Sequence, residues 1–165
     1  MSTLCPRKIK PAVGTVIAFL LFIVLPATAQ TDTLSVSGGS GAPGGRIVVP
    51  VTLANHGAIA GLQMRLTPSS DVLALDSLTV TPRTQGMQVQ WNPVNNMVIM
   101  IDMSMKRMIT AGQGPILNVH YRIGATAKSD TTHIRISDAV LSDASGLGTP
   151  LKTREGKVII RAKTR

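Results

Sequence analysis

The feature that most constrains the fold of this chain is the absence of any long helical period after residue 29. Short runs rich in β-branched residues alternate with clusters of glycine, proline, asparagine and aspartate. Apolar and polar residues alternate within several of these runs, which is typical of strands with one buried face. The pattern predicts an all-β fold, and we expect about nine antiparallel strands in a jelly-roll-like β-sandwich.

The first 29 residues have the pattern of a secretory signal peptide and are set apart from the fold. A basic start, an apolar run over residues 12–25 and small residues before position 30 predict cleavage between Ala29 and Gln30. The apolar run is shorter than the roughly 20 residues of a membrane-spanning helix, so we expect membrane attachment only if the signal stays uncleaved. The remaining residues, 30–165, are predicted to form one domain that is secreted or held in the cell envelope.

Cysteine and charge restrict the function classes further. The only cysteine, Cys5, precedes the apolar run, so the exported chain would contain no disulfide and its core must stabilise it alone. Without the three basic residues of the signal, 14 basic residues stand against 8 acidic ones, a net charge of +6. The basic residues are scattered and no nucleic-acid-binding motif accompanies them. The charge therefore predicts attraction to an acidic protein surface and no nucleic-acid partner.

Two details of the first predicted strands can be checked against a structure. The segment GGSGAPGG, residues 38–45, is so rich in glycine and proline that we expect a turn without regular structure. Pro50 lies inside the next apolar run, residues 46–55. Because proline cannot donate a ladder hydrogen bond, this strand should lie at a sheet edge or contain a bulge.

Three segments, in order, carry a resemblance to a known family. In residues 35–55, a strand is followed by a Gly-Pro-Gly turn and a second strand with an internal proline. In residues 59–80, a strand is followed by a turn and an apolar step. In residues 136–151, a strand ends in a Ser-Asp-x-x-Gly turn. This order resembles the cohesin domain, the β-sandwich module that binds dockerin domains and so assembles extracellular enzyme complexes such as cellulosomes. The resemblance implies a non-catalytic module with a dockerin-type partner, linked to polysaccharide breakdown through that partner.

The resemblance also implies which sheet docks the partner. Its strands would correspond here to residues 59–66, 87–91, 97–103 and 116–123. Within them, the alternation of apolar and polar residues predicts which side chains point outward. These predicted partner-binding residues are Gln63, Arg65, Gln88, Gln90, Met97, Ile99, Ile101, Met103, Asn118, His120 and Arg122. Together they would form an apolar stripe with a polar rim, the usual anatomy of a protein interface.

The apolar stripe has a second interpretation. Residues 97–101, MVIMI, do not alternate at all. Either the outward half, including Ile99 and Ile101, is an exposed contact surface, or the chain's own loops cover it and the strand is buried on both faces.

Other functional classes find little support in the sequence. Glu155 is the only glutamate, the three histidines lack metal-ligand spacing, and residues 30–165 contain no cysteine nucleophile. We therefore expect no enzyme activity, no cofactor and no metal site. A carbohydrate-binding module remains an alternative because such modules are also β-sandwiches, although only Trp91 and Tyr121 could stack on sugars. A self-associating structural or adhesion subunit is the other alternative.

Overall fold

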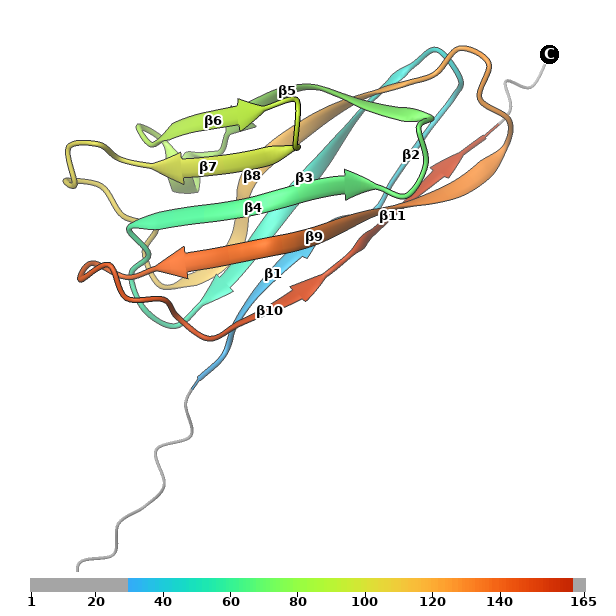
Figure 1. Cartoon of the computed structure of the whole chain (residues 1–165). Helices are drawn as coiled ribbons and strands as arrows, with labels where there is room; N and C mark the ends of the chain where they lie inside the picture. The colour runs from blue at the N-terminus through green and yellow to red at the C-terminus, as the bar shows by residue number, and fades with distance from the viewer. Residues whose placement is uncertain (1–29, 162–165) are drawn as a thin grey trace, which may run out of the picture.

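A computed structural model describes residues 30–161 as two β-sheets packed face to face (Figure 1). The predicted signal peptide, residues 1–29, lies outside the described residues. The strands are β1 (Asp32–Val36), β2 (Gly39–Gly41), β3 (Arg46–Asn55), β4 (Gly61–Pro68), β5 (Leu73–Val80), β6 (Gln88–Asn92), β7 (Met97–Ile101), β8 (Gly112–Ile123), β9 (Asp130–Ser142), β10 (Leu151–Arg154) and β11 (Gly156–Ile160), with a 3-10 turn, η1 (Pro82–Thr84), between β5 and β6. The predicted all-β sandwich is confirmed, although it has eleven strands rather than about nine.

The two sheets have different strand orders. The back sheet runs β10-β1-β3-β8-β5, and the front sheet runs β2-β11-β9-β4-β7-β6. In Figure 1 the strands β6, β7, β4 and β9 cross the front of the molecule. Neighbouring strands are antiparallel except at two outer pairs, where β1 lies parallel to β10 and β11 parallel to β2. Within residues 30–161, no helix is long and apolar enough to cross a membrane.

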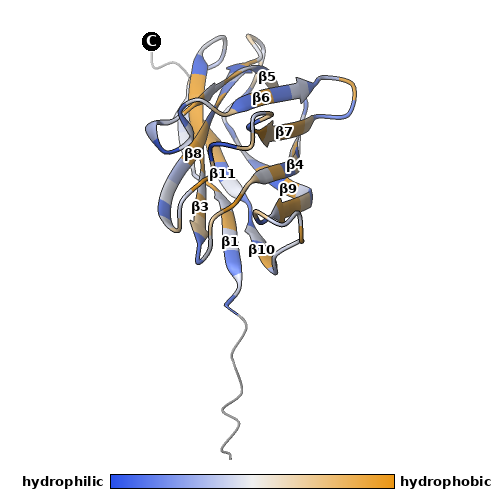
Figure 2. Cartoon of the chain, turned by 90° about the vertical axis from the view of Figure 1, so that its left-hand side faces the viewer, coloured by the Kyte–Doolittle hydropathy of each residue, from blue (hydrophilic) through white to orange (hydrophobic). Residues whose placement is uncertain are grey.

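The core lies between the sheets and consists of the inward-facing residues of both. Figure 2 shows the apolar segments on strands of both layers. The largest fully buried side chains include Leu34, Leu53, Leu117 and Tyr121 from the back sheet and Met64, Leu66, Met100 and Ile134 from the front sheet. Burying one such side chain contributes about 1.5–3 kcal/mol. Burial also raises the pKa of the Tyr121 phenol above its ordinary range, so this ring stays neutral in the core.

The glycine-rich segment after β1 is not a plain turn. Residues Gly39–Gly41 form β2, which pairs with β11 at the edge of the front sheet. A Cβ atom on Gly41 would lie 2.5 Å from Cγ2 of Ile47 and 2.6 Å from Cδ1 of Ile123. The expectation of irregular structure is therefore wrong for Gly39–Gly41. Glycine is needed at position 41 because the edge strand β2 lies so close to the core that a side chain would not fit.

A bulge lies close to Pro50, although the extra residue, Ile116, belongs to the partner strand β8. Its strand, β3, lies between β1 and β8 in the interior of the back sheet, so of the two predicted alternatives the edge strand is wrong. The register between β3 and β8 shifts between Val51 and Thr52, directly after the proline. The Pro50 carbonyl still accepts a hydrogen bond from the Ser37 amide at 2.8 Å. The polar side of Pro50 thus faces β1 just beyond the last paired residues, Val36 and Val51, so the missing donor falls at the end of that ladder.

Gly156 allows a direct test of sheet packing. A Cβ atom there would lie 2.5 Å from the Ser37 carbonyl oxygen and 2.5 Å from Cγ1 of Val36. Because a backbone atom cannot move aside as a side-chain end can, Gly156→Ala should lower the free energy of unfolding by about 1–3 kcal/mol in urea titrations. Gly57→Ala is the control, since its Cβ would meet no atom within 4 Å. An equal loss in both variants would contradict this packing.

Candidate functional site

The candidate surface is the outer face of four front-sheet strands, β9, β4, β7 and β6, which we call the front face. Strand pairing places four residues side by side across these strands: Val140, Gln63, Ile99 and Gln90. Val140 is 51% exposed and Ile99 is 42% exposed. Two apolar side chains therefore lie at the middle of the face, separated and bordered by glutamines.

The outward orientation predicted for β7 and β4 is confirmed. In β7, Val98 and Met100 are fully buried while Ile99 between them is exposed. In β4, Leu62 and Met64 are buried while Gln63 points outward and is half-buried. Strand β7 lacks alternation because one of its faces belongs to the core and the other forms an apolar surface. The alternative that the chain's own loops cover Ile99 is wrong for the described part of the chain.

The other predicted residues of β6 and β7 border this centre. Gln88 and Gln90 are exposed on β6, the edge strand of the front sheet. Met97 and Ile101, at the two ends of β7, are half-buried, and Met103 is 71% exposed in the loop that follows. The front face therefore has an apolar centre and a polar edge, as predicted for these five residues.

Arg65 lies on the front face but is held in place by its neighbours. Its Nε donates a hydrogen bond to Oδ2 of Asp138 at 2.7 Å, and its Nη1 donates to the Asn95 carbonyl at 2.8 Å. The ion pair with Asp138 is partly exposed, so it contributes little to stability. Its main effect is to orient the guanidinium at the border of the face.

Three predicted partner-binding residues lie on the opposite side of the molecule: Asn118, His120 and Arg122. Their strand, β8, pairs with β3 and β5 in the back sheet. There His120 Nε2 lies 3.1 Å from Thr79 Oγ1, and Arg122 Nη2 donates to Asp76 Oδ1 at 2.7 Å. The prediction that they share a sheet with Ile99 is wrong. Alternation shows which residues of a strand point outward, but it does not show which sheet the strand joins.

Strand β9 takes the place predicted for β8, and its contribution was missed. Ile134, Ile136 and Leu141 are buried while Val140 is exposed, so the inward positions change from even to odd along the strand. A bulge causes this change, because the register with β4 shifts and Asp138 has a positive φ of 48°. The only sequence signal was an aspartate, a residue that tolerates this conformation. A strict two-residue period would place Val140 in the core.

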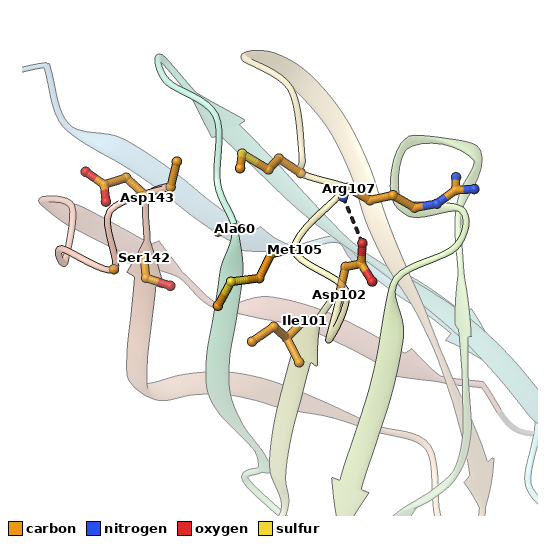
Figure 3. A pocket seen from close by; sticks show the side chains of 10 residues that line it. Ala60, Ile101, Asp102, Met105, Arg107, Ser142 and Asp143 are labelled. Carbon is orange, nitrogen blue, oxygen red and sulfur yellow. Dashed lines mark hydrogen bonds between the residues drawn. The ribbon is translucent and has the colours of Figure 1, made fainter.

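A pocket of about 170 Å³ lies where β7 and β9 end, beside the front face (Figure 3). Its walls are the loop after β7, residues 102–108, and the loop after β9, residues 143–146. Its apolar lining consists of Ala60, Ile101, Met105, Met108 and Ala144. The pocket is continuous with the front face because Ile101 is the last residue of β7.

The loop after β7 is organised by the carboxylate of Asp102. It accepts hydrogen bonds from the Ser104 hydroxyl at 2.7 and 2.8 Å and from the amides of Ser104, Lys106 and Arg107 at 2.8–3.0 Å. The Ser104 hydroxyl bond is the largest cause that lowers the pKa of Asp102. The carboxylate is therefore fully engaged within its own loop.

The carboxylate of Asp143 acts in the same way on the other wall. It accepts hydrogen bonds from the hydroxyl and amide of Ser145 at 2.7 and 2.8 Å and from the Leu147 amide at 3.0 Å. These bonds, with the Ser145 hydroxyl first, lower the pKa of Asp143. The carboxylates of Asp102 and Asp143 thus both stabilise the conformation of their own loops.

Metal binding and sugar stacking are not supported by the arrangement of the described residues. In residues 30–161, no group of three or more His, Cys, Asp or Glu side chains could hold a metal ion. Tyr121 is fully buried, and Trp91 is half-buried and packed against the core. Tyr121 therefore cannot stack on a sugar, and a single half-buried ring does not make a platform.

The family model for the cohesin domain matches residues 33–160, almost the whole described chain. The chain belongs to the cohesin domain family. Its members are non-catalytic modules, and the sandwich described above is their fold.

Several cohesins are similar to this one. The non-cellulosomal cohesin of Archaeoglobus fulgidus is 20% identical with a TM-score of 0.67, covering 80% of this chain and 92% of that chain. The sixth cohesin of scaffoldin B from Acetivibrio cellulolyticus, solved with a mutant Cel5 dockerin, is 19% identical with a TM-score of 0.66, covering 80% and 100%. Cellulose-binding protein A of Clostridium cellulovorans is 25% identical over 138 residues, which is 81% of this chain but 8% of that protein.

The Asp102 loop predicts a pH dependence of stability. A carboxylate whose pKa is lowered by folding stabilises the folded state above its ordinary pKa of about 3.9, and this contribution is lost as the pH falls. Asp102→Asn should therefore unfold at a lower temperature at pH 7 and show a flatter decline toward pH 3 in calorimetry. Asp71→Asn, on an exposed residue outside both loops, should keep the wild-type profile. Coincident profiles for Asp102→Asn and wild type would contradict the assignment.

Proposed function

We propose that this cohesin domain is a docking module that binds a dockerin-type partner on the front face. The observation that carries the proposal is the exposed row of Val140 and Ile99, bordered by Gln63 and Gln90. An apolar centre with a polar rim is the usual anatomy of a protein interface, and exposed apolar patches on folded domains commonly mark contact surfaces. The domain itself performs no chemistry in this proposal.

Similar proteins support this kind of partner. The cohesin from Acetivibrio cellulolyticus was solved with a dockerin bound, and the relative from Clostridium cellulovorans is named for cellulose binding. By analogy, this domain would reach polysaccharide indirectly, through an enzyme or module that carries the dockerin. The buried Tyr121 and half-buried Trp91 argue against direct sugar binding by this chain.

Charge favours a partner with an acidic surface. Residues 30–165 have a net charge of +6. Lys106 and Arg107, in the loop beside the front face, are exposed and form no ion pair within residues 30–161. Such charges attract an acidic partner and raise the association rate, most strongly at low salt.

The proposed site can be tested with a charge at its centre. Ile99→Asp should reduce binding to dockerin modules encoded in the same genome by more than about 30-fold in surface plasmon resonance, because it places a charge in a desolvated contact. Its unfolding midpoint should change little, since Ile99 is already 42% exposed. Val48→Asp is the matched control because Val48 is 49% exposed on the back sheet, and this variant should bind normally.

Three outcomes would contradict the proposed site. Equal losses in Ile99→Asp and Val48→Asp would indicate a general effect on the fold. Normal binding by Ile99→Asp with a loss in His120→Ala would move the site to the back sheet. Concentration-dependent dimers in size-exclusion chromatography that Ile99→Asp abolishes would indicate self-association through the same face.

We also propose that the domain reaches the extracellular space or cell envelope through cleavage after Ala29. Cohesins are typically extracellular or cell-surface modules, and the first 29 residues have the order of a signal peptide. Intact-mass measurement of protein from the culture medium should give a chain that begins at Gln30. A full-length chain recovered from the membrane fraction would show instead that the segment acts as an anchor.

A further inference from the structure

The two loops that wall the pocket share one backbone motif, Asp-x-Ser-x. It spans Asp102–Met105 in one loop and Asp143–Gly146 in the other. In both, the carboxylate accepts bonds from the serine amide and hydroxyl, and the amide of the fourth residue donates to the aspartate carbonyl at 2.9 or 3.0 Å. In both, the fourth residue has a positive φ, 54° for Met105 and 80° for Gly146.

Met105 is the unusual residue of this pair. A positive φ suits glycine, whereas a residue with a Cβ adopts it at a cost of roughly 1–2 kcal/mol. The Met105 side chain is 78% exposed, so burial within the domain does little to offset that cost. Neither the loop geometry nor the core therefore explains methionine at this position. Backbone strain of this kind is characteristic of functional sites.

The lining of the pocket indicates what it could hold. In Figure 3 the Met105 side chain lies between Ile101 and Ser142, and the Arg107 guanidinium points away from the pocket. Arg107 Nη1 donates to the Gln85 carbonyl at 3.2 Å, and the Ser142 hydroxyl donates to the Gly61 carbonyl at 3.4 Å. Since the Asp102 and Asp143 carboxylates are also engaged, the polar groups of the pocket are already bonded within the chain. An apolar group is thus favoured over a metal ion or a polar ligand.

We propose that this pocket is an anchoring subsite for one aliphatic side chain of the partner that covers Ile99. The inference rests on the proposed function, and it adds a specificity determinant at one end of the front face. Ile101 lies two residues after Ile99 on the same side of β7 and lines the pocket, so one partner can contact both. The volume of about 170 Å³ suits a leucine-sized group, since an apolar cavity of about 150 Å³ accepts benzene.

The rigidity of the walls supports this role. Binding energy in protein interfaces concentrates where an anchor side chain enters a well-formed pocket. Carboxylates that bond three or four groups in each loop hold both walls before the partner arrives. A preformed pocket avoids the cost of ordering loops on binding. Methionines in its lining can adjust to differently branched aliphatic groups.

A partner-independent test uses the methionine methyl groups. With [13C-methyl]methionine labelling, N-acetyl-leucine amide at millimolar concentration should shift the Met105 and Met108 signals in a saturable way. The signals of Met64 and Met100, which are fully buried in the core, should stay in place. N-acetyl-aspartic acid amide is the matched control and should shift none of them. Absence of leucine-dependent shifts, or equal shifts with both compounds, would overturn the subsite.

A second test separates binding from stability. Met105→Gly restores the residue that the other loop uses, so its unfolding midpoint should equal or exceed that of the wild type. Its affinity for a dockerin that binds the wild type should fall about tenfold because an apolar contact is lost. The control, Leu147→Ala, changes an exposed apolar residue of the other loop that does not line the pocket, and it should bind normally.

The two tests distinguish failure of this inference from failure of the proposed function. Unchanged dockerin affinity in Met105→Gly, while Ile99→Asp abolishes binding, would overturn the subsite and leave the docking face intact. If no dockerin binds the wild type, the proposed function fails, and with it the role of this pocket as a dockerin subsite. The methyl shifts with N-acetyl-leucine amide then report only whether the pocket accepts an aliphatic side chain.

Discussion

The exposed position of Ile99 at the centre of the front face depends on the register in which β7 lies between β4 and β6. This register buries Val98 and Met100 and leaves Ile99 exposed between Gln63 and Gln90. Because β7 is apolar on both faces, a slip of one residue would only exchange one apolar set for another, so its own pattern does not select the register. Pairing with β4 and β6, whose apolar and polar residues alternate, accompanies the register that exposes Ile99.

The loops at the end of β7 and β9 extend this order beyond the sheet. Each is closed by an aspartate that accepts hydrogen bonds from its own loop, so both connections have a defined hydrogen-bonded conformation. One loop has glycine at its left-handed position, as the backbone prefers, and the other has Met105. The difference between two otherwise matched loops marks a position where local stability alone does not account for the residue. The loop beside the front face is where such a residue would meet a partner.

The only cysteine is Cys5, so residues 30–161 contain no disulfide and are held together by packing and hydrogen bonds. Close approaches at Gly41 in β2 and Gly156 in β11 bring two neighbouring strands of the front sheet against residues of the core, and the buried residues of both sheets pack together behind them. Tyr121 and Trp91 are the only aromatic residues of the described chain, and one is buried while the other is half-buried. The described surface therefore lacks a set of exposed rings on which a sugar could stack. An aliphatic and methionine-rich surface suits another protein better. Composition and packing thus both favour a protein over a polysaccharide as the partner.

The sequence by itself determined the fold class, the family and the outward residues of β4, β6 and β7, because a two-residue period is a local property of each strand. Only the tertiary structure decided which strands share a sheet. That placement moved Asn118, His120 and Arg122 to the back and brought Val140 to the front. The bulge at Asp138, the pairing of β2 with β11 and the strained backbone of Met105 were also beyond the sequence. The bulge and the β2–β11 pairing depend on contacts between segments far apart in the chain, and the Met105 backbone on hydrogen bonds within its loop; local periodicity contains no information about either.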